Sequence, residues 1–377
     1  MATVSYEFLE RAEDISAFFA SLANEPVVAV DLEADSLHSY REKVCLVQVS
    51  TPSRNAVVDP LPDRDALAGL GSLWADPAVQ KVVHGGDYDV RLLKKDYGYS
   101  PQNLFDTMIA AQFAGRTRVG LAALLEEHFG VVLDKKHQRA DWSARPLSAE
   151  MLRYAALDTA YLIPLKTLLE EELERLGRLG WAREEFALLE RAEPAPEKKP
   201  WCLDVKGAAR LSPRQLAVLQ ELLELRDRVA RQWDRPPFKV LSNAVLLAWA
   251  EAPPASRREV IETPGAGKKI LARLAESVLD GIRQARRLPD ADCPRLPPRT
   301  GRDPLTEAEE KRLKRLKRAR AAAVERLGLP PGLLVNTATL ERLAREAQGS
   351  GADGVEGHLK PWQLEAVGDD LRRALAR

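Results

Sequence analysis

The sequence predicts an α/β domain followed by two small helical bundles, and three observations lead to this fold class. In the first half of the 377 residues, short apolar runs alternate with amphipathic segments, a pattern typical of strands with helices between them. A segment rich in proline and charge, residues 194–200, then interrupts the chain and cannot continue a helix. Beyond it, apolar residues recur at helical spacing. The length suffices for two or three domains, each with its own core.

Four apolar runs in the first half are the predicted strands: Val27–Glu33, Val44–Ser50, Ala56–Asp59 and Lys81–His84. The first run ends in Asp31 and Glu33, and because residues i and i+2 of a strand lie on one face, both carboxylates project together. Carboxylates held this close repel each other and lose hydration unless a cation or a shared proton relieves them. We interpret this strand end as a candidate metal site, although a charged strand end can also simply meet water.

Two further acidic segments lie between the predicted strands and the helices that follow them. Asp87 and Asp89 come just after the fourth predicted strand and its glycine turn, at the start of an amphipathic segment. Further along, Asp106 or Thr107 is expected to cap the next helix. The intervals between these acids and the first pair suit a single site.

The last acidic segment is predicted to lie on a helix that begins at the capping residue Ser148. This helix carries Tyr154 and Asp158, which are four residues apart and therefore on one face, with Cβ atoms about 5–6 Å apart. Its apolar positions leave room for this pair to face the sheet. Taken singly, Tyr154 could be a core aromatic and Asp158 a surface acid.

Together, these segments resemble the DEDD superfamily of 3′→5′ exonucleases, in the branch with a tyrosine in the last motif, and within it the ribonuclease D family. The matching segments occur in the family's order and spacing, and they are Val30–Glu33, Val44–Val49, Val83–Asp89, Leu104–Thr107, Gln138–Leu147 and Tyr154–Asp158. The resemblance implies a ribonuclease-H-like fold with a mixed sheet. In the family's second motif the ligand position corresponds to Asp89. Asp87 falls at a variable position, where it would lie behind the ligands or in water.

The resemblance also implies a reaction and its cofactors. Enzymes of this family release 5′-nucleotides hydrolytically from RNA 3′ ends, such as those of tRNA precursors. Two divalent cations, Mg²⁺ or Mn²⁺, about 3.5–4 Å apart can stabilise the attacking and the leaving oxygen at phosphorus, and such hard ions take oxygen ligands. Tyr154 would orient the attacking water. The metal ligands implied by the resemblance are Asp31, Glu33, Asp89 and Asp158.

Three polar residues before the last motif, Gln138, Arg139 and Arg145, are candidates for holding the substrate strand. They could equally cap or brace the helix that begins at Ser148. His84 is the only histidine near a motif, and at a strand end we expect it to make a structural hydrogen bond. No Ser/His/Asp or Cys/His arrangement competes with the acidic site as a source of chemistry.

Composition argues against several classes of protein. The three cysteines, Cys45, Cys202 and Cys293, are too few and too dispersed for a disulfide framework or a zinc site, which fits a reducing compartment. The N-terminus has neither a basic nor an apolar signal region, and no run of about 18 apolar residues occurs. We therefore expect a cytoplasmic protein with no membrane partner. We also predict that it acts as a monomer.

The net charge is zero, but it is unevenly distributed. Residues 1–199 hold 23 basic and 32 acidic side chains, a net charge of −9, and residues 200–377 hold 33 and 24, a net charge of +9. A basic appendage could attract the polyphosphate that an acidic catalytic domain repels. Solvated helical faces would explain the same excess of Lys and Arg equally well.

The helical half is predicted to hold two domains. An exonuclease domain, residues 1–193, and a linker, residues 194–210, precede them. Residues 211–287 resemble the HRDC domain, a small helical bundle shared by RecQ helicases and ribonuclease D, above all in Asp234–Phe238. We interpret residues 301–377 as a second, degenerate HRDC-like domain.

Local signals mark the helices of both domains. The first helix of the HRDC-like domain is expected to begin at the cap Ser212 with Pro213 in its first turn, and another near Asn243. In the last domain, Lys311–Arg320 packs seven basic residues into ten beside a thin apolar stripe, which predicts a helix with one buried edge. Its charges either contact nucleic acid or are merely solvated. Leu329–Asn336 loosely repeats the interrupted-helix pattern of the first bundle.

Two alternative functions fit part of the same pattern. A 3′→5′ DNA exonuclease acting in repair would use the same chemistry with single-stranded DNA as its substrate. A catalytically silent RNA-binding scaffold would keep the fold without the reaction. However, all five active-site positions are intact, and a silent protein has no chemical reason to retain the charge cost they impose.

Overall fold

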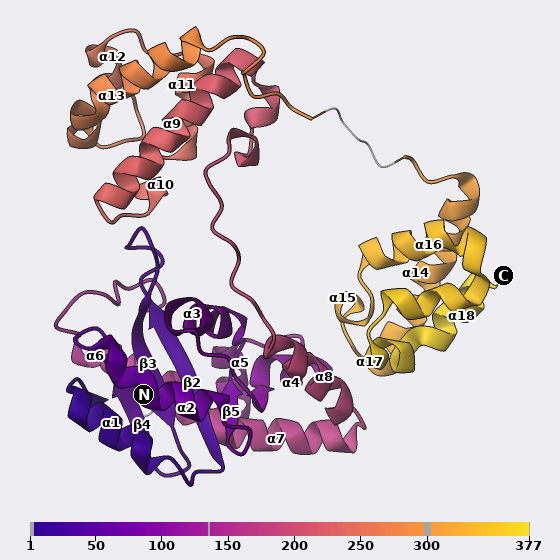
Figure 1. The fold of residues 1–377 in the computed structure, drawn as a ribbon. Coiled ribbons are helices and arrows are strands. Elements are labelled where there is room, and N and C mark those ends of the chain that lie inside the picture. The colour runs from indigo at the N-terminus through magenta and orange to yellow at the C-terminus, as the bar shows by residue number, and fades with distance from the viewer. Residues whose placement is uncertain (1–3, 135, 298–302, 377) are drawn as a thin grey trace. The chain divides into compact units, whose positions relative to one another are not determined.

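The structure, a computed structural model, describes residues 4–134, 136–297 and 303–376. The predicted fold class is confirmed, because an α/β domain with a mixed sheet is followed by a helical region (Figure 1). The outermost residues of the predicted first and last domains, namely 1–3, 301–302 and 377, lie outside the described residues.

The chain divides into two compact units. The first unit combines residues 1–33, 44–194 and 303–377, so the C-terminal helices belong with the sheet. The second unit combines residues 34–43 and 195–302.

A six-stranded mixed sheet lies at the centre of the first unit. Its strands are β1 Glu7–Leu9, β2 Val27–Ala34, β3 Val44–Ser50, β4 Asn55–Val58, β5 Gln80–Val83 and β6 Leu104–Asp106. Their order is β1-β4-β3-β2-β5-β6, with β3 and β4 antiparallel. β2 pairs parallel with β5, and β5 pairs parallel with β6. These three strands therefore end at the same edge of the sheet, which is the edge that carries the acids described below.

The four predicted strands correspond to β2, β3, β4 and β5, each within one residue of its predicted ends. β1 and β6 are not among the predicted strands. Each has only three residues, too few to display an alternating pattern. β6 is a strand because β5 provides its hydrogen-bonding partner, with Val82 opposite Phe105 and Val83 opposite Asp106.

Among the described residues up to 189, eight α-helices accompany the sheet. They are α1 Ala12–Ser21, α2 Ala68–Ala75, α3 Asp87–Tyr97, α4 Thr107–Phe113, α5 Leu121–Phe129, α6 Ala149–Ala160, α7 Leu162–Arg175 and α8 Leu179–Leu189, with a 3-10 turn at Arg64–Leu67. Two predicted caps are confirmed. The Asp106 side chain accepts hydrogen bonds from the first amides of α4, and the Ser148 hydroxyl accepts one from Met151 N at 3.2 Å. These caps satisfy amides that have no partner within the helix.

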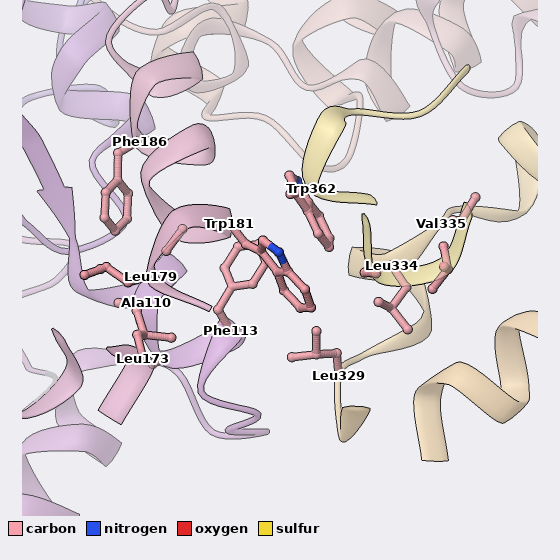
Figure 2. Packing of buried hydrophobic residues seen from close by; sticks show 14 of the residues in the cluster. Ala110, Phe113, Leu173, Leu179, Trp181, Phe186, Leu329, Leu334, Val335 and Trp362 are labelled. Atoms are coloured by element: carbon pink, nitrogen blue, oxygen red, sulfur yellow. The ribbon is translucent and has the colours of Figure 1, made fainter. Parts of the chain in front are cut away.

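The first unit ends in a bundle of helices that packs on α4 and α8. Its elements are α14 Glu307–Leu327, α15 Pro331–Leu334, α16 Thr337–Ser350, a 3-10 helix at Gly351–His358, α17 Pro361–Gln363, a π-helical turn at Leu364–Gly368 and α18 Asp369–Leu375. Figure 2 shows Trp362 beside Phe113 and Trp181, with ring centroids 4.9 and 5.9 Å away. The Trp362 indole also donates to Glu185 at 2.7 Å. This end of the bundle thus shares a core with the α/β domain.

The second unit is dominated by a bundle of α-helices. They are α9 Pro213–Gln232, α10 Pro237–Val240, α11 Asn243–Glu251, α12 Arg257–Glu262 and α13 Lys268–Arg287, preceded by 3-10 turns at Cys202–Asp204 and Ala208–Arg210. The predicted start of α9 is confirmed, because Ser212 caps it in a capping box with Gln215 and Pro213 occupies the first turn. The predicted start at Asn243 is confirmed as well. None of the described helices is both long and apolar enough to span a membrane.

Candidate active site

The end of β2 brings two carboxylates to one face of the sheet. Asp31 and Glu33 are two residues apart on this strand, so both side chains point the same way. Asp158 from α6 meets them there, and ligand-capable oxygens of the three residues lie within 4.8 Å of one another. The expectation that the first and last acidic segments meet at one place is confirmed by this distance.

Helix α6 delivers Asp158 and Tyr154 because its small residues pack closely on the sheet. Ala155 and Ala156 are buried against Cys45 of β3 and its neighbours, and the helix begins at the Ser148 cap. Tyr154 and Asp158 lie one turn apart and line the same cavity. The pair therefore faces the strand end as the spacing predicts.

The second acidic segment places Asp89 and Asp87 in different surroundings. Both lie in the first turn of α3, which follows Gly85 and Gly86. Gly85 has a φ of +67°, a backbone conformation that favours glycine. The Asp89 side chain is buried, and its charge acts on Glu33. The Asp87 side chain is 63% exposed and forms an ion pair with Arg91 at 2.9 Å. Asp89 is not within the 4.8 Å cluster, but it faces the same group of acids.

The carboxyl groups of the site are difficult to ionise together. Burial raises the pKa of Asp31 to about 7, and burial together with the charges of Asp31, Asp158 and Asp89 raises the pKa of Glu33 to about 10. Burial and neighbouring carboxylates likewise raise the pKa values of Asp89 and Asp158. The charged neighbours that shift Glu33, Asp89 and Asp158 are all carboxylates.

A divalent cation fits this donor set. The ligand atoms are all hard carboxylate oxygens, and a positive ion would relieve both their mutual repulsion and the cost of their burial. Tyr154 shares the environment, since burial and the charge of Asp158 raise the pKa of its phenol. The group can therefore hold cations, and a hydroxyl group lies beside it.

One residue of the site was not singled out from the sequence for its role there. Asp106 is buried at the end of β6, and its carboxylate accepts hydrogen bonds from Gly85 N at 3.0 Å and Gly86 N at 2.9 Å. It also accepts from Met108 N and Ile109 N, as the cap of α4. Asp106 thus ties the start of α4 to the turn that precedes Asp89. The capping signal in the sequence identified the role of Asp106 as the cap of α4 and gave no sign of its hydrogen bonds to the glycine turn.

His84 and Thr107 form a second link at the same place. Thr107 donates its hydroxyl to Val83 O at 3.0 Å, and His84 Nδ1 lies 2.9 Å from that hydroxyl. The structural hydrogen bond expected of His84 is therefore confirmed. Burial lowers the pKa of the His84 imidazole, so burial favours the neutral ring.

The three candidate substrate residues differ in what they contact. Gln138 lines a cavity of about 640 Å³ together with His84, Tyr154 and Asp158. Arg139 is exposed and does not line this cavity. The guanidinium of Arg145 is committed within the protein. It forms an ion pair with buried Asp59 and donates to the carbonyls of Cys45, Trp142 and Ala144. For Arg145 the structure provides contacts for bracing the segment before α6, the second of its two expected roles.

Comparison with known proteins gives matches over both units. Residues 6–174 match the family model described as 3′-5′ exonuclease, and residues 215–282 match the HRDC domain. Ribonuclease D of Granulibacter bethesdensis is 33% identical over 347 residues, which cover 90% of this chain and 86% of that protein. Ribonuclease D of Escherichia coli is 32% identical over 294 residues, which cover 77% and 78%.

Solved structures agree with these matches. The crystal structure of E. coli RNase D, an exoribonuclease involved in structured RNA processing, aligns over 99% of both chains with a TM-score of 0.72 and 26% identity. The catalytic core of RRP6 from Trypanosoma brucei aligns over 76% of this chain and 81% of that chain, with a TM-score of 0.69 and 32% identity. The chain therefore belongs to the ribonuclease D family of 3′→5′ exoribonucleases.

Proposed function

We propose that this enzyme uses two divalent cations, Mg²⁺ or Mn²⁺, to trim the 3′ ends of structured RNA, tRNA precursors among them. The observation that carries the proposal is the cluster of Asp31, Glu33 and Asp158, whose oxygens lie within 4.8 Å of one another. Such a cluster is costly unless cations occupy it. Buried Asp89 completes the ligand set, which then matches the four acids implied by the sequence.

The residues of the site have two roles in the proposed reaction, holding the cations and orienting the attacking water. When bound, the cations supply Lewis-acid stabilisation of charge on the attacking and leaving oxygens. Asp31, Glu33, Asp89 and Asp158 hold them at the end of β2. Tyr154, one helical turn from Asp158, orients the attacking water towards the terminal phosphodiester. Every group with a chemical role thus lies in the first unit.

The substrate is proposed to enter the cavity that borders Tyr154. Gln138 lines this cavity with His84 and is the candidate that its position supports for contacting the terminal nucleotide. Arg139 is exposed and does not line the cavity, and it is proposed to contact the substrate strand outside it. Structured RNA is the substrate class because E. coli RNase D, similar over the whole chain, is described as an exoribonuclease of structured RNA processing.

The domain organisation is proposed as an exonuclease domain to residue 193, a linker over 194–210, an HRDC domain over 211–287 and a second HRDC-like domain over 301–377. A parallel between α9–α11 and α14–α16 supports the last assignment. In each case a long helix is followed by a four-residue helix that starts at a proline, Pro237 or Pro331, and then by another helix. Action as a monomer in the cytoplasm is also proposed, and the three cysteines, which are buried and form no disulfide within the described residues, fit a reducing compartment.

The test is hydrolysis of matched single-stranded RNA and DNA oligonucleotides, with free and blocked 3′ ends, in Mg²⁺, in Mn²⁺ and in EDTA. We expect stepwise shortening of RNA from a free 3′ end, release of 5′-nucleotides and no reaction in EDTA. Faster cleavage of DNA than of RNA would replace this proposal by the DNA exonuclease. Cleavage that ignores a blocked 3′ end would contradict the exonucleolytic direction.

A further inference from the structure

Six of the seven basic residues between Lys311 and Arg320 on α14 fall into two groups that differ in their contacts. Three of its arginines donate to backbone carbonyls of neighbouring helices: Arg312 to Ala344 at 2.7 Å, Arg315 to Ala374 at 2.9 Å and Arg320 to Val335 at 2.8 Å. Positive donors at helix carbonyls, above all near helix C-termini, stabilise the bundle. These arginines are therefore part of the fold.

The second group consists of Lys314, Lys317 and Arg318. All three are exposed, and within the described part of the chain they make no hydrogen bond or ion pair. Lys311, by contrast, pairs with Glu307 one turn away. Because residues three and four positions apart lie on one face of a helix, the three unpaired cations form a single charged strip.

The strip borders a groove with an apolar floor. A cavity of about 490 Å³ is lined by Leu305, Leu313, Ala321 and the three unpaired cations, with Glu310 as the single acid. This volume lies in the range of about 300–1,000 Å³ that small-ligand pockets occupy. The groove therefore offers an apolar surface beside an excess of positive charge, the combination that a nucleotide unit with its base, sugar and phosphate requires.

We propose that this groove on α14, with Lys314, Lys317 and Arg318, is an RNA-strand binding surface that is separate from the active site. The inference rests on the proposed function, because an RNA substrate is the polyanion that such a surface would hold. The rise between residues 314 and 318 is about 6 Å along the helix, comparable with the separation of neighbouring phosphates. The cations contact successive phosphates, and the apolar floor contacts a base or sugar.

Charge complementarity favours RNA over a protein partner. The catalytic site is a cluster of three carboxylates, so the site itself cannot attract a polyanion before cations bind. A basic surface in the same unit would supply that attraction without taking part in the reaction. Contacts to phosphate carry no sequence information, so the surface is expected to bind RNA of any sequence.

The test compares two double variants of the full-length protein that remove the same charge. K317Q/R318Q neutralises the strip, and R342Q/R373Q neutralises two exposed arginines of the same bundle that do not line the groove. Binding of a fluorescein-labelled single-stranded RNA is followed by anisotropy in EDTA, which prevents cleavage, over a range of salt concentrations. Each lost phosphate contact should lower the slope of log K against log[salt] by about 0.7 for a single strand. We therefore expect K317Q/R318Q to flatten the slope by about 1.4, and R342Q/R373Q to leave it unchanged.

The two proposals can fail separately. Cleavage of a short oligonucleotide in Mn²⁺ should proceed at the wild-type rate in K317Q/R318Q, because the strip touches no reacting atom. If the wild type cleaves RNA but both double variants keep the wild-type salt slope, the surface proposal is overturned and the proposed reaction stands. A variant that keeps RNA affinity but loses binding of poly-glutamate would identify the groove as a docking site for acidic protein segments, and would equally overturn the proposal.

Discussion

Two clusters of like charge in the first unit are stabilised in opposite ways. At the end of β2, Asp31, Glu33 and Asp158 crowd together, and the charges that act on Glu33 are further carboxylates. On α14, several arginines donate to carbonyl groups of neighbouring segments, as Arg315 and Arg320 do. Within the described residues the charged groups that act on Glu33, Asp89 and Asp158 are carboxylates, so we expect a bound cation to compensate them. In the basic run, part of the positive charge is hydrogen-bonded within the bundle and so stabilises the fold.

This difference shows how charge in a sequence should be interpreted. A block of seven basic residues is conspicuous in the sequence, yet part of it holds the bundle together. The acids are spread over four separate segments and are inconspicuous singly, yet they meet at one place. The density of charge along the chain therefore says less about function than whether the folded protein satisfies each charge.

The largest effect is expected at the uncompensated cluster. Asp31→Ala or Glu33→Ala should abolish hydrolysis in Mg²⁺ and Mn²⁺, because each removes a cation ligand, a loss greater than the ~10–100-fold typical of changes behind a metal site. RNA binding in EDTA should persist. Melting temperature in EDTA should stay the same or rise, since a repelling carboxylate has been removed. Undiminished nuclease activity in either variant would refute the metal-site assignment.

A second prediction separates two acids of the same helix turn. Asp89→Asn should reduce activity severely, because the residue is buried and faces the acidic cluster. Asp87→Asn makes the same chemical change at an exposed residue that pairs with Arg91 on the surface. It should leave activity within about twofold and stability within about 0.5 kcal/mol. Initial rates on one RNA oligonucleotide decide the matter, and equal losses in the two variants would show that the register of this motif is misassigned.

Part of this site could be predicted from the sequence, and part could not. The strand face of Asp31 and Glu33 and the helix face of Tyr154 and Asp158 follow from local periodicity, and the structure brings the acids together. Their catalytic roles stay predictions. The role of Asp106 in holding the β5–α3 turn was not predicted, because it joins segments twenty residues apart through backbone amides of glycines, which leave no side-chain signal.

Long-range packing was also outside the reach of sequence patterns. β6 is a strand because β5 pairs with it. In the sequence alone, its three residues look like the segment that leads into the next helix. The contact of Trp362 with Phe113 joins residues far apart in the chain, although each looks like an ordinary core aromatic in its own helix. The basic residues on α14 could be recognised from the sequence as a helical face, but not sorted into structural and unpaired cations.

Asp106→Asn tests whether an acid can act on the site without being a ligand. The carboxylate accepts from four backbone amides, and an amide group in its place would present N–H groups to some of these donors. We expect Mn²⁺ affinity, measured by calorimetry, to fall ~10–100-fold, as is typical when the support behind a metal ligand is lost. Stability should fall by about 2 kcal/mol, since charge-assisted hydrogen bonds are lost.

The calorimetric result distinguishes positioning from simple destabilisation. If Asp106 only caps α4, Asp106→Asn would unfold at a lower temperature but bind Mn²⁺ with wild-type affinity while folded. Excess Mn²⁺ should restore most of the activity if the loss lies in metal affinity. Failure of high Mn²⁺ to raise the rate, together with unaltered affinity, would show that Asp106 has no influence on the site.

The smallest effects are expected on α14, where two neighbouring residues represent the two kinds of cation. Arg315 is partly buried and donates to Ala374 O at 2.9 Å, so Arg315→Gln should destabilise the protein by about 1–3 kcal/mol, as expected for a lost charged hydrogen bond that leaves a carbonyl unpaired. Lys314→Gln removes the same charge from an exposed side chain and should change stability by less than about 0.5 kcal/mol. Urea unfolding of both variants gives the two free energies directly. Equal destabilisation would mean that Lys314 also supports the fold, and the division of this helix into structural and unpaired cations would then be wrong.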